Sequence, residues 1–249
     1  MKTLYTTLLA LLVTCSMSAK TYALFTGVSD YDGTSHDLTQ STKDAKSMNE
    51  FYKQRGATTS ILTSKYATHD NIIAVIRKMA QKATKNDDVI FYYSGHGAPN
   101  AIYTHDGNNN PPLTYSEIIS ELNKCRCRRI IVYIDACYSG TASSAVTSKD
   151  IAPDTWKTMM KDKGNCIMML SSKDGETSGE SGLVGAGFFT RALLKALKGS
   201  GDRNHDKKMT VNEVFRYVYN DVLRHSKNKQ HPQLVTPKGM REDVLIDWN

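Results

Sequence analysis

Short apolar runs alternate with amphipathic segments along most of this chain. The apolar runs cover residues 22–28, 58–62, 88–93, 130–134 and 166–170. Between and after these runs we expect helices at residues 43–54, 71–82, 115–122, 188–197 and 211–223, followed by a closing segment at residues 233–235. In one of the amphipathic segments, Ile72, Ile76 and Met79 recur at the spacing of a single helix face. Strands that are apolar throughout and are separated by helices form parallel sheets that are buried on both faces. We therefore predict an α/β fold, with a single doubly wound, mainly parallel sheet flanked by helices.

Length and charge limit the classes to which this protein can belong. With 249 residues, of which 40% are hydrophobic, the chain can bury the core of one large domain. The formal net charge of +7 is spread along the chain without a block of like charges. We read this basicity as surface character and expect no nucleic-acid partner.

The first residues have the pattern of a secretory signal peptide. Lys2 precedes the apolar run of residues 8–13, and small residues follow up to Ala19. The run is too short to cross a bilayer core of about 30 Å, and no later segment resembles a membrane span. We predict a signal peptide at residues 1–19, a folded domain at residues 20–249, and a secreted or periplasmic protein. The alternative is an outer-surface lipoprotein with a lipid anchor at Cys15, although Thr14 fits a lipoprotein cleavage box poorly.

Four cysteines remain after the signal peptide: Cys125, Cys127, Cys137 and Cys166. A domain of this size does not need disulfides for its stability. One bridge from Cys125 or Cys127 to Cys166 stays an open alternative, because these residues precede consecutive strands. Cys137 would then remain a free thiol.

Candidate reactive side chains follow two of the apolar runs. His96 lies between two glycines after the run at residues 88–93, and Cys137 follows the run at residues 130–134. In an open parallel sheet the carboxyl ends of the strands form one rim, where ligands bind. A histidine after a strand often only satisfies a loop, and a cysteine is often a small core residue. At matching strand ends, however, the imidazole can generate the reactive thiolate, which favours nucleophilic catalysis.

These two segments resemble the paired catalytic motifs of the caspase-like cysteine peptidases, of the metacaspase or bacterial type. His96 and Cys137 are 41 positions apart, near the roughly fifty residues of caspases. Asp135 stands where true caspases have a glutamine two residues before the cysteine. The similarity extends to residues 23–31, 43–45, 187–190 and 233–235. It implies a caspase-like fold for residues 20–249.

The resemblance also implies a mechanism and a specificity. His96 would deprotonate Cys137, and the backbone N–H groups of Gly97 and Cys137 would hold the oxyanion. Metacaspase-like enzymes have an acidic pocket for the substrate residue before the cleaved bond. The matching positions here are Asp44, Ser94 and Asp135. Buried carboxylates select a cation, so we expect protein or peptide substrates with Arg or Lys before the cleaved bond. Asp44 has a second interpretation, as a charge that stabilises the N-terminus of its helix.

A separate motif follows the spacing of an EF-hand calcium loop. Its oxygen-bearing residues are Asp202, Asn204, Asp206, Thr210 and Glu213. Lys207 replaces the expected glycine, and Thr210 with Glu213 also fits a helix capping box. We therefore expect no required cofactor, with Ca²⁺ as an optional ligand of this loop.

The leading hypothesis is a secreted cysteine endopeptidase that cuts after Arg or Lys through a Cys137/His96 dyad. The lysine-bearing loop at residues 143–164 is a candidate for self-processing, or is simply a solvated surface loop. Two alternatives remain. One is a catalytically silent caspase-like binding scaffold. The other is a legumain-like peptide ligase, in which an amine rather than water resolves the acyl-enzyme.

Overall fold

The computed structural model describes residues 19–31, 37–98, 101–107, 110–136, 164–173 and 182–248, with the backbone alone at residues 182–186. Residues 1–18 of the predicted signal peptide, including Cys15, lie outside the described residues. The same holds for residues 143–163 of the predicted processing loop. In the described part of the chain, no helix combines the length and the apolar character needed to cross a membrane.

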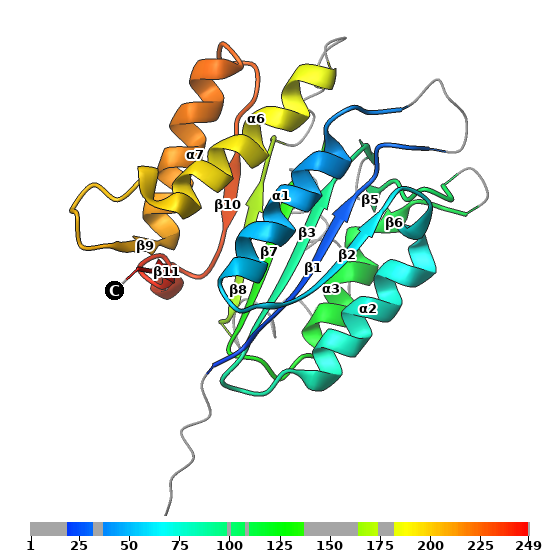
Figure 1. The fold of residues 1–249 in the computed structure, drawn as a ribbon, viewed down its shortest axis with the longest axis horizontal. Coiled ribbons are helices and arrows are strands. Elements are labelled where there is room, and N and C mark those ends of the chain that lie inside the picture. Colours follow the sequence, from blue (N-terminus) through cyan, green and yellow to red (C-terminus); the bar gives the residue numbers. More distant parts are fainter. Residues whose placement is uncertain are drawn as a thin grey trace, which may run out of the picture.

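A six-stranded sheet forms the centre of the molecule, with strand order β10-β8-β7-β3-β1-β2. Its strands are β1 (Thr21–Gly27), β2 (Thr58–Thr63), β3 (Asp88–Ser94), β7 (Arg129–Asp135), β8 (Cys166–Leu170) and β10 (Gln233–Val235). The first five run parallel, and β10 pairs antiparallel with β8. This confirms the predicted α/β fold with a single, mainly parallel sheet (Figure 1).

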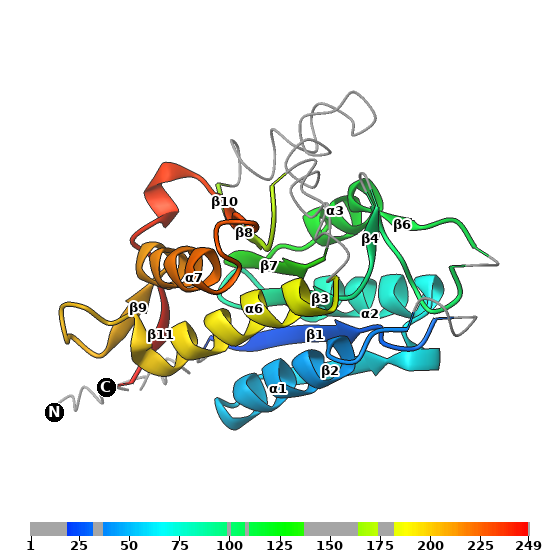
Figure 2. The ribbon, with the colours of Figure 1, turned by 90° about the horizontal axis from the view of Figure 1, so that it is seen from above.

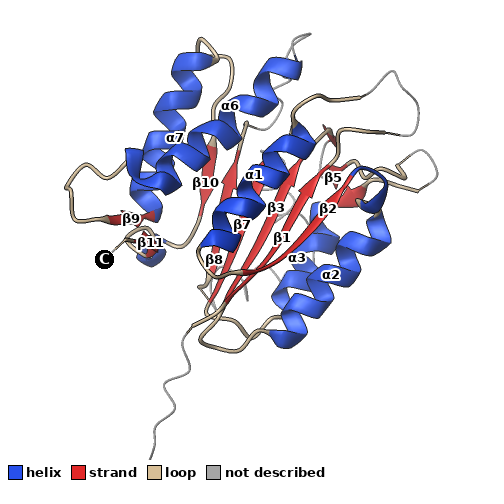
Figure 3. Ribbon diagram, viewed as in Figure 1, coloured by secondary structure: helices blue, strands red, loops and turns tan. Residues whose placement is uncertain are grey.

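Helices cover both faces of the sheet (Figures 2 and 3). One face carries α1 (Ser41–Gln54), α6 (Gly182–Lys195) and α7 (Val211–His225). The other carries α2 (His69–Lys82) and α3 (Tyr115–Asn123). Among the described residues there are also three short helical turns: η2 (Ser64–Tyr66), η4 (Ala196–Ser200), which continues α6, and η5 (Lys238–Met240).

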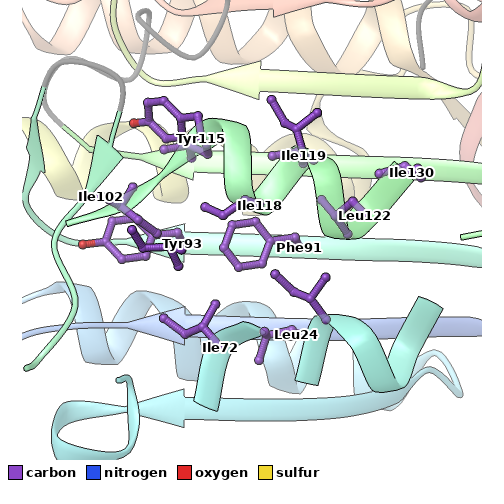
Figure 4. Packing of buried hydrophobic residues seen from close by; sticks show 14 of the residues in the cluster. Leu24, Ile72, Phe91, Tyr93, Ile102, Tyr115, Ile118, Ile119, Leu122 and Ile130 are labelled. Carbon is purple, nitrogen blue, oxygen red and sulfur yellow. The ribbon is translucent and has the colours of Figure 1, made fainter. Parts of the chain in front are cut away.

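The strands divide their side chains between two hydrophobic cores. All residues of β3 and β7 are buried. Because successive strand residues point to opposite faces, Phe91 packs toward α2 and α3 while Tyr92 packs toward α1 and α6. Figure 4 shows the first core, where Ile72 of α2 and Ile118 of α3 meet the sheet. Each large apolar side chain buried in this way contributes roughly 1.5–3 kcal/mol.

Helix starts follow local capping chemistry. At the start of α3 the Thr114 hydroxyl accepts from the Glu117 N–H while the Glu117 carboxylate accepts from the Thr114 N–H. Thr210 and Glu213 form the same capping box at the start of α7. Such a box satisfies two backbone donors that would otherwise be unpaired, so both helices begin where the sequence places a threonine followed three residues later by a glutamate.

Two small antiparallel sheets are absent from the sequence-based prediction. One consists of β4 (Gly97–Ala98), β5 (Ala101–Ile102) and β6 (Leu113–Thr114), and the other of β9 (Lys208–Thr210) and β11 (Val244–Asp247). Strands of two to four residues are too short to show a hydrophobic period. The bridge to Cys166 that the sequence left open is not formed, because Cys125, Cys127 and Cys166 are buried thiols that no disulfide joins.

Candidate active site

The carboxyl ends of three neighbouring strands meet at one level of the sheet. Ser94, the last residue of β3, is the register partner of Gly27 on β1 and of Asp135 on β7. The pairing continues past the strands, since the Gly95 N–H donates to the Asp135 carbonyl at 3.2 Å. His96 therefore lies at this rim. Cys137, two positions after Asp135 in the sequence, lies outside the described residues.

The main chain of His96 is held from both sides by tyrosines. Its N–H donates to the Tyr31 hydroxyl at 2.6 Å. Its carbonyl accepts from the Tyr93 hydroxyl at 2.8 Å and from the Tyr103 N–H at 3.1 Å. The histidine itself is only partly buried. Gly97 follows it as the first residue of β4 and pairs with Ile102.

Asp135 is a buried carboxylate at the end of β7. Its Oδ2 accepts two hydrogen bonds from Thr190 on α6, from the N–H at 3.1 Å and from the hydroxyl at 2.7 Å. Burial raises the pKa of Asp135 well above its usual range, and the charge of the nearby Asp44 raises it further. Two hydrogen bonds therefore do not compensate fully for the lost hydration.

Asp44 approaches the same place from the first turn of α1. Burial raises the pKa of its carboxyl to about 7. Asp44 Oδ2, Ser94 Oγ and Asp135 Oδ1 are all buried and have no hydrogen-bond partner among the described residues. The three predicted pocket residues thus share one property, a buried oxygen that is available to a donor. A cationic donor is the group that two adjacent carboxylates favour most.

Two residues at this rim were not singled out for a role from the sequence. Thr190 orients Asp135 from a helix 55 positions away in sequence. Ser171, just after β8, binds both backbone groups of Ala136: its hydroxyl accepts from the Ala136 N–H at 3.1 Å and donates to the Ala136 carbonyl at 3.0 Å. Ala136 directly precedes Cys137 in the sequence. The signal for Ser171 is its place directly after the apolar run at residues 166–170, because the carboxyl ends of parallel strands share one rim.

The predicted calcium loop follows η4, includes β9 and ends in the first turn of α7, away from the carboxyl ends of the central strands (Figure 1). Several of its oxygens bind within the loop: Asp202 Oδ2 accepts from the Lys207 N–H at 3.0 Å, and Asp206 Oδ1 accepts from the Lys208 N–H at 2.9 Å. Lys207 has a φ of 62°, the left-handed conformation for which an EF-hand uses glycine. No cluster of three or more His, Cys, Asp or Glu suited to a metal occurs among the described residues. The role of Asn204, Thr210 and Glu213 as calcium ligands stays a prediction.

Comparison with known proteins gives a consistent result. A family model described as a caspase domain matches residues 20–241. The chain is 25% identical over 228 residues to Metacaspase-1 of the yeast Meyerozyma guilliermondii, an alignment that covers 78% of this chain and 52% of that protein. It is 26% identical over 204 residues to a probable protease of a Desulfuromonadales bacterium, covering 71% of this chain and 24% of that protein. The chain thus spans about half or less of the length of these relatives.

A solved structure shares the fold. The crystal structure of a protein from Geobacter sulfurreducens superposes with a TM-score of 0.58 and 20% sequence identity. The match covers 92% of this chain and 98% of that chain. At this level of identity the similarity concerns the arrangement of helices and strands.

Proposed function

The chain belongs to the caspase domain family, a family of cysteine-type peptidases, and from this premise we propose that it is a secreted endopeptidase that cleaves protein substrates after Arg or Lys. Cys137 is the nucleophile of this proposal and His96 its general base. The observation that carries the specificity is the pair of carboxylates, one buried and one partly buried, at the same rim of the sheet as His96. Asp44 and Asp135 each keep a buried oxygen without a partner among the described residues, and burial raises the pKa of both.

A cationic substrate side chain resolves this electrostatic cost. A guanidinium or ammonium group that enters the pocket supplies hydrogen-bond donors to the unpartnered oxygens and favours the ionised form of both carboxyls. A substrate with an acidic residue at the same position would add a third negative charge to a poorly hydrated site. The pocket therefore supports Arg or Lys before the cleaved bond and disfavours Asp.

The proposed reaction proceeds in two steps. In the first, the proton of the Cys137 thiol moves to the His96 imidazole, and the sulfur attacks the carbonyl carbon of the substrate peptide bond. The imidazolium then gives its proton to the leaving amine, and a thioester remains on Cys137. In the second step His96 takes a proton from water, the hydroxide attacks the thioester, and the carboxylic acid and the free thiol are released. Backbone N–H groups of Gly97 and Cys137 hold the oxyanion in both steps.

Three further parts of the proposal concern the context of the enzyme. Export follows from the signal-peptide pattern at residues 1–19, with the lipid anchor at Cys15 as the alternative. Self-processing follows from the lysines at residues 143–164, which an enzyme of this specificity would recognise. Catalysis by the dyad requires no cofactor, and Ca²⁺ at the loop of residues 202–213 is optional.

The decisive experiment uses fluorogenic peptides that differ only in the residue before the cleaved bond: Arg, Lys, Asp or Asn. We expect cleavage of the Arg and Lys peptides, and a decrease in kcat of at least about a thousandfold in Cys137→Ala, because that variant has no nucleophile. Cys127→Ala is the matched control, since it removes a buried thiol at the opposite end of β7.

Two outcomes contradict the proposal. Equal turnover by Cys137→Ala and the unmodified protein excludes Cys137 as the nucleophile. Cleavage restricted to the Asp peptide excludes the acidic pocket while leaving the peptidase activity in place. Standards of the two possible products of the Arg peptide, the free acid from hydrolysis and the amide from transfer to an added amine, distinguish these two reactions.

A further inference from the structure

We propose that Tyr31 and Tyr93 are positioning residues that set the orientation of the His96 imidazole, an inference that rests on the proposed peptidase function. Both tyrosines are buried next to a histidine that is only partly buried. They come from two different parts of the chain: Tyr31 follows β1, and Tyr93 lies in β3. Neither residue is part of the chemistry described above.

The tyrosine hydroxyls bind the two polar groups of the His96 main chain. Tyr31 Oη accepts the His96 N–H at 2.6 Å. Tyr93 Oη lies 2.8 Å from the His96 carbonyl and 2.6 Å from the Tyr103 carbonyl, so its single proton is shared between these two acceptors. The two hydroxyls lie 3.4 Å apart, within reach of each other. A buried hydroxyl without partners costs free energy, and here the main chains of His96 and Tyr103 supply the partners. This network fixes the peptide from which the imidazole projects.

The ring of Tyr31 also contacts the imidazole itself. The two ring centroids are 4.7 Å apart and the ring planes are inclined by 43°. An aromatic ring at this distance limits the rotation of the imidazole. The main chain of Tyr31 is held in turn by Asp37, whose Oδ1 accepts the Tyr31 N–H at 3.0 Å. Tyr31 thus acts on both the backbone and the side chain of His96.

Gly95 is the residue that makes this arrangement sterically feasible. A Cβ atom at position 95 would overlap the Tyr93 hydroxyl and would lie 2.6 Å from Tyr31 Oη. Real Cβ atoms do not approach other atoms so closely, so any side chain here would displace both hydroxyls. The glycine before His96 is therefore required by the tyrosine contacts. Its backbone N–H meanwhile binds the Asp135 carbonyl, which joins the His96 segment to β7.

The functional consequence follows from the geometry of proton transfer. A general base must lie within hydrogen-bond reach of the group it deprotonates, and an error of about 1 Å can reduce the rate by about a hundredfold. An imidazole held in place also stabilises a neighbouring thiolate, which lowers the pKa of the thiol. Loss of the Tyr31 hydroxyl is therefore expected to affect the reactivity of the cysteine without affecting the acidic pocket.

The test compares Tyr31→Phe with Tyr52→Phe in the full chain. Tyr52 is the matched control because it is a similarly buried tyrosine, 6% exposed against 8% for Tyr31. Its hydroxyl also pairs with that of a second tyrosine, Tyr133, at 3.3 Å. Each variant thus removes one buried hydroxyl from a tyrosine pair, but only Tyr31 contacts His96. Four quantities are measured for each: kcat and KM on the Arg peptide, Tm, and the pH dependence of alkylation of Cys137 by iodoacetamide, with Cys137→Ala as the background.

We expect kcat of Tyr31→Phe to fall by about tenfold, the equivalent of one hydrogen bond, with KM unchanged. The pH midpoint of alkylation should move upward, toward the ordinary value of about 8.5 for a free thiol. Tyr52→Phe should retain kcat and the midpoint of the unmodified protein while losing a similar amount of Tm. Tyr93→Phe should change kcat and the midpoint in the same direction as Tyr31→Phe.

The inference is overturned if the alkylation midpoint and kcat of Tyr31→Phe equal those of Tyr52→Phe. It is also overturned if Tyr31→Phe lowers only Tm, because that result assigns the tyrosine a purely structural role. Failure of the proposed function looks different: the unmodified protein then cleaves no Arg or Lys peptide. In that case the alkylation midpoints still decide whether Tyr31 acts on the histidine and the cysteine.

Discussion

At the scale of single residues, this protein keeps two carboxylates where burial penalises their charge. Asp44 and Asp135 lie close enough that the charge of Asp44 raises the pKa of Asp135. A core built only for stability would avoid such a pair, since each unpaired buried charge costs free energy. The arrangement is consistent with a binding site whose ligand brings the missing positive charge. Stability and function are therefore expected to change in opposite directions when either carboxylate is neutralised.

The first prediction at this scale concerns Asp44→Asn and pH. The pKa of Asp44 is about 7 in the folded protein against 3.8 for the unperturbed group. Below pH 4 the carboxyl is neutral in both states. Between pH 4 and 7 it ionises only in the unfolded chain, so its destabilising effect grows with pH and is complete above pH 7. Asp44→Asn should thus raise the free energy of unfolding at pH 8 by about 1–2 kcal/mol, because partial solvation reduces the full effect. At pH 4 it should change little.

The same variant should bind substrate less well. KM for the Arg peptide should fall in the unmodified protein as pH rises through 7, when Asp44 becomes ionised, and this dependence should be weaker in Asp44→Asn. Urea denaturation at pH 4 and 8, together with KM at pH 6 and 8, provides the measurement. Glu50→Gln, an exposed charge change on the same helix, is the control. A stability difference that is equal at both pH values would contradict this explanation.

At the scale of secondary-structure elements, the proposed pocket depends on two helices that pack against each other. Helix α1 contributes Asp44, and the neighbouring α6 contributes Thr190. The Thr190 hydroxyl lies 2.7 Å from both Asp135 Oδ2 and the Tyr92 hydroxyl. This chain of buried hydrogen bonds links β3, α6 and β7. The position of α6 over the sheet thereby determines the orientation of the Asp135 carboxylate.

The prediction for this element is that Thr190→Val raises KM for the Arg peptide. The preference for Arg or Lys before the cleaved bond should stay the same. The substitution preserves shape but leaves Asp135 and Tyr92 without a hydroxyl partner, which should destabilise the protein by about 1–3 kcal/mol. Thr190→Ser retains the hydroxyl and should restore most of both properties. Steady-state kinetics and thermal unfolding of the two variants measure this effect. Identical KM values for Thr190→Val and Thr190→Ser would show that the hydroxyl does not orient Asp135.

At the scale of the whole molecule, the two ends of the central sheet have different roles. The carboxyl ends of the strands carry the candidate site. At the amino ends, Asp88 is buried and binds Arg128 and Arg129 through paired contacts of 2.6–3.2 Å. Arg129 also donates to the Val244 carbonyl at 2.8 Å, which ties β11 to the sheet. This end of the sheet stabilises the fold. The length of β3 separates it from the candidate site.

Asp88→Asn should therefore affect stability without affecting catalysis. Removing one partner of a buried ion pair leaves uncompensated charge and is expected to cost about 3–5 kcal/mol. Because the site lies at the opposite ends of the same strands, kcat/KM at 25 °C should stay within about twofold of the unmodified protein. Denaturant unfolding and kinetics on the Arg peptide provide the comparison, with the exposed Asp70→Asn as the control. A large loss of kcat/KM in a fully folded Asp88→Asn protein would show that the two ends are coupled.

Much of the fold was predictable because its signals are local. The apolar runs and the helical spacing of Ile72 to Met79 reflect burial along one segment at a time, and such patterns are visible in the sequence. The capping box of Thr210 and Glu213 was predictable for the same reason. Strands of two to four residues, such as β4 and β9, carry too few side chains to show a period. The sequence left a bridge to Cys166 open, and the structure does not form it, because cysteine count and spacing do not determine side-chain geometry.

The order of elements, the parallel sheet and the location of His96 at its rim were thus determined by the sequence itself, since hydrophobic period and strand ends are properties of neighbouring residues. Only the tertiary structure decided which side chains surround that rim. Tyr31 and His96 are 65 positions apart, and Tyr92 and Thr190 are 98 apart. Contacts over such separations depend on how the helices pack on the sheet. No local pattern encodes that packing, because it results from the joint burial of many distant segments.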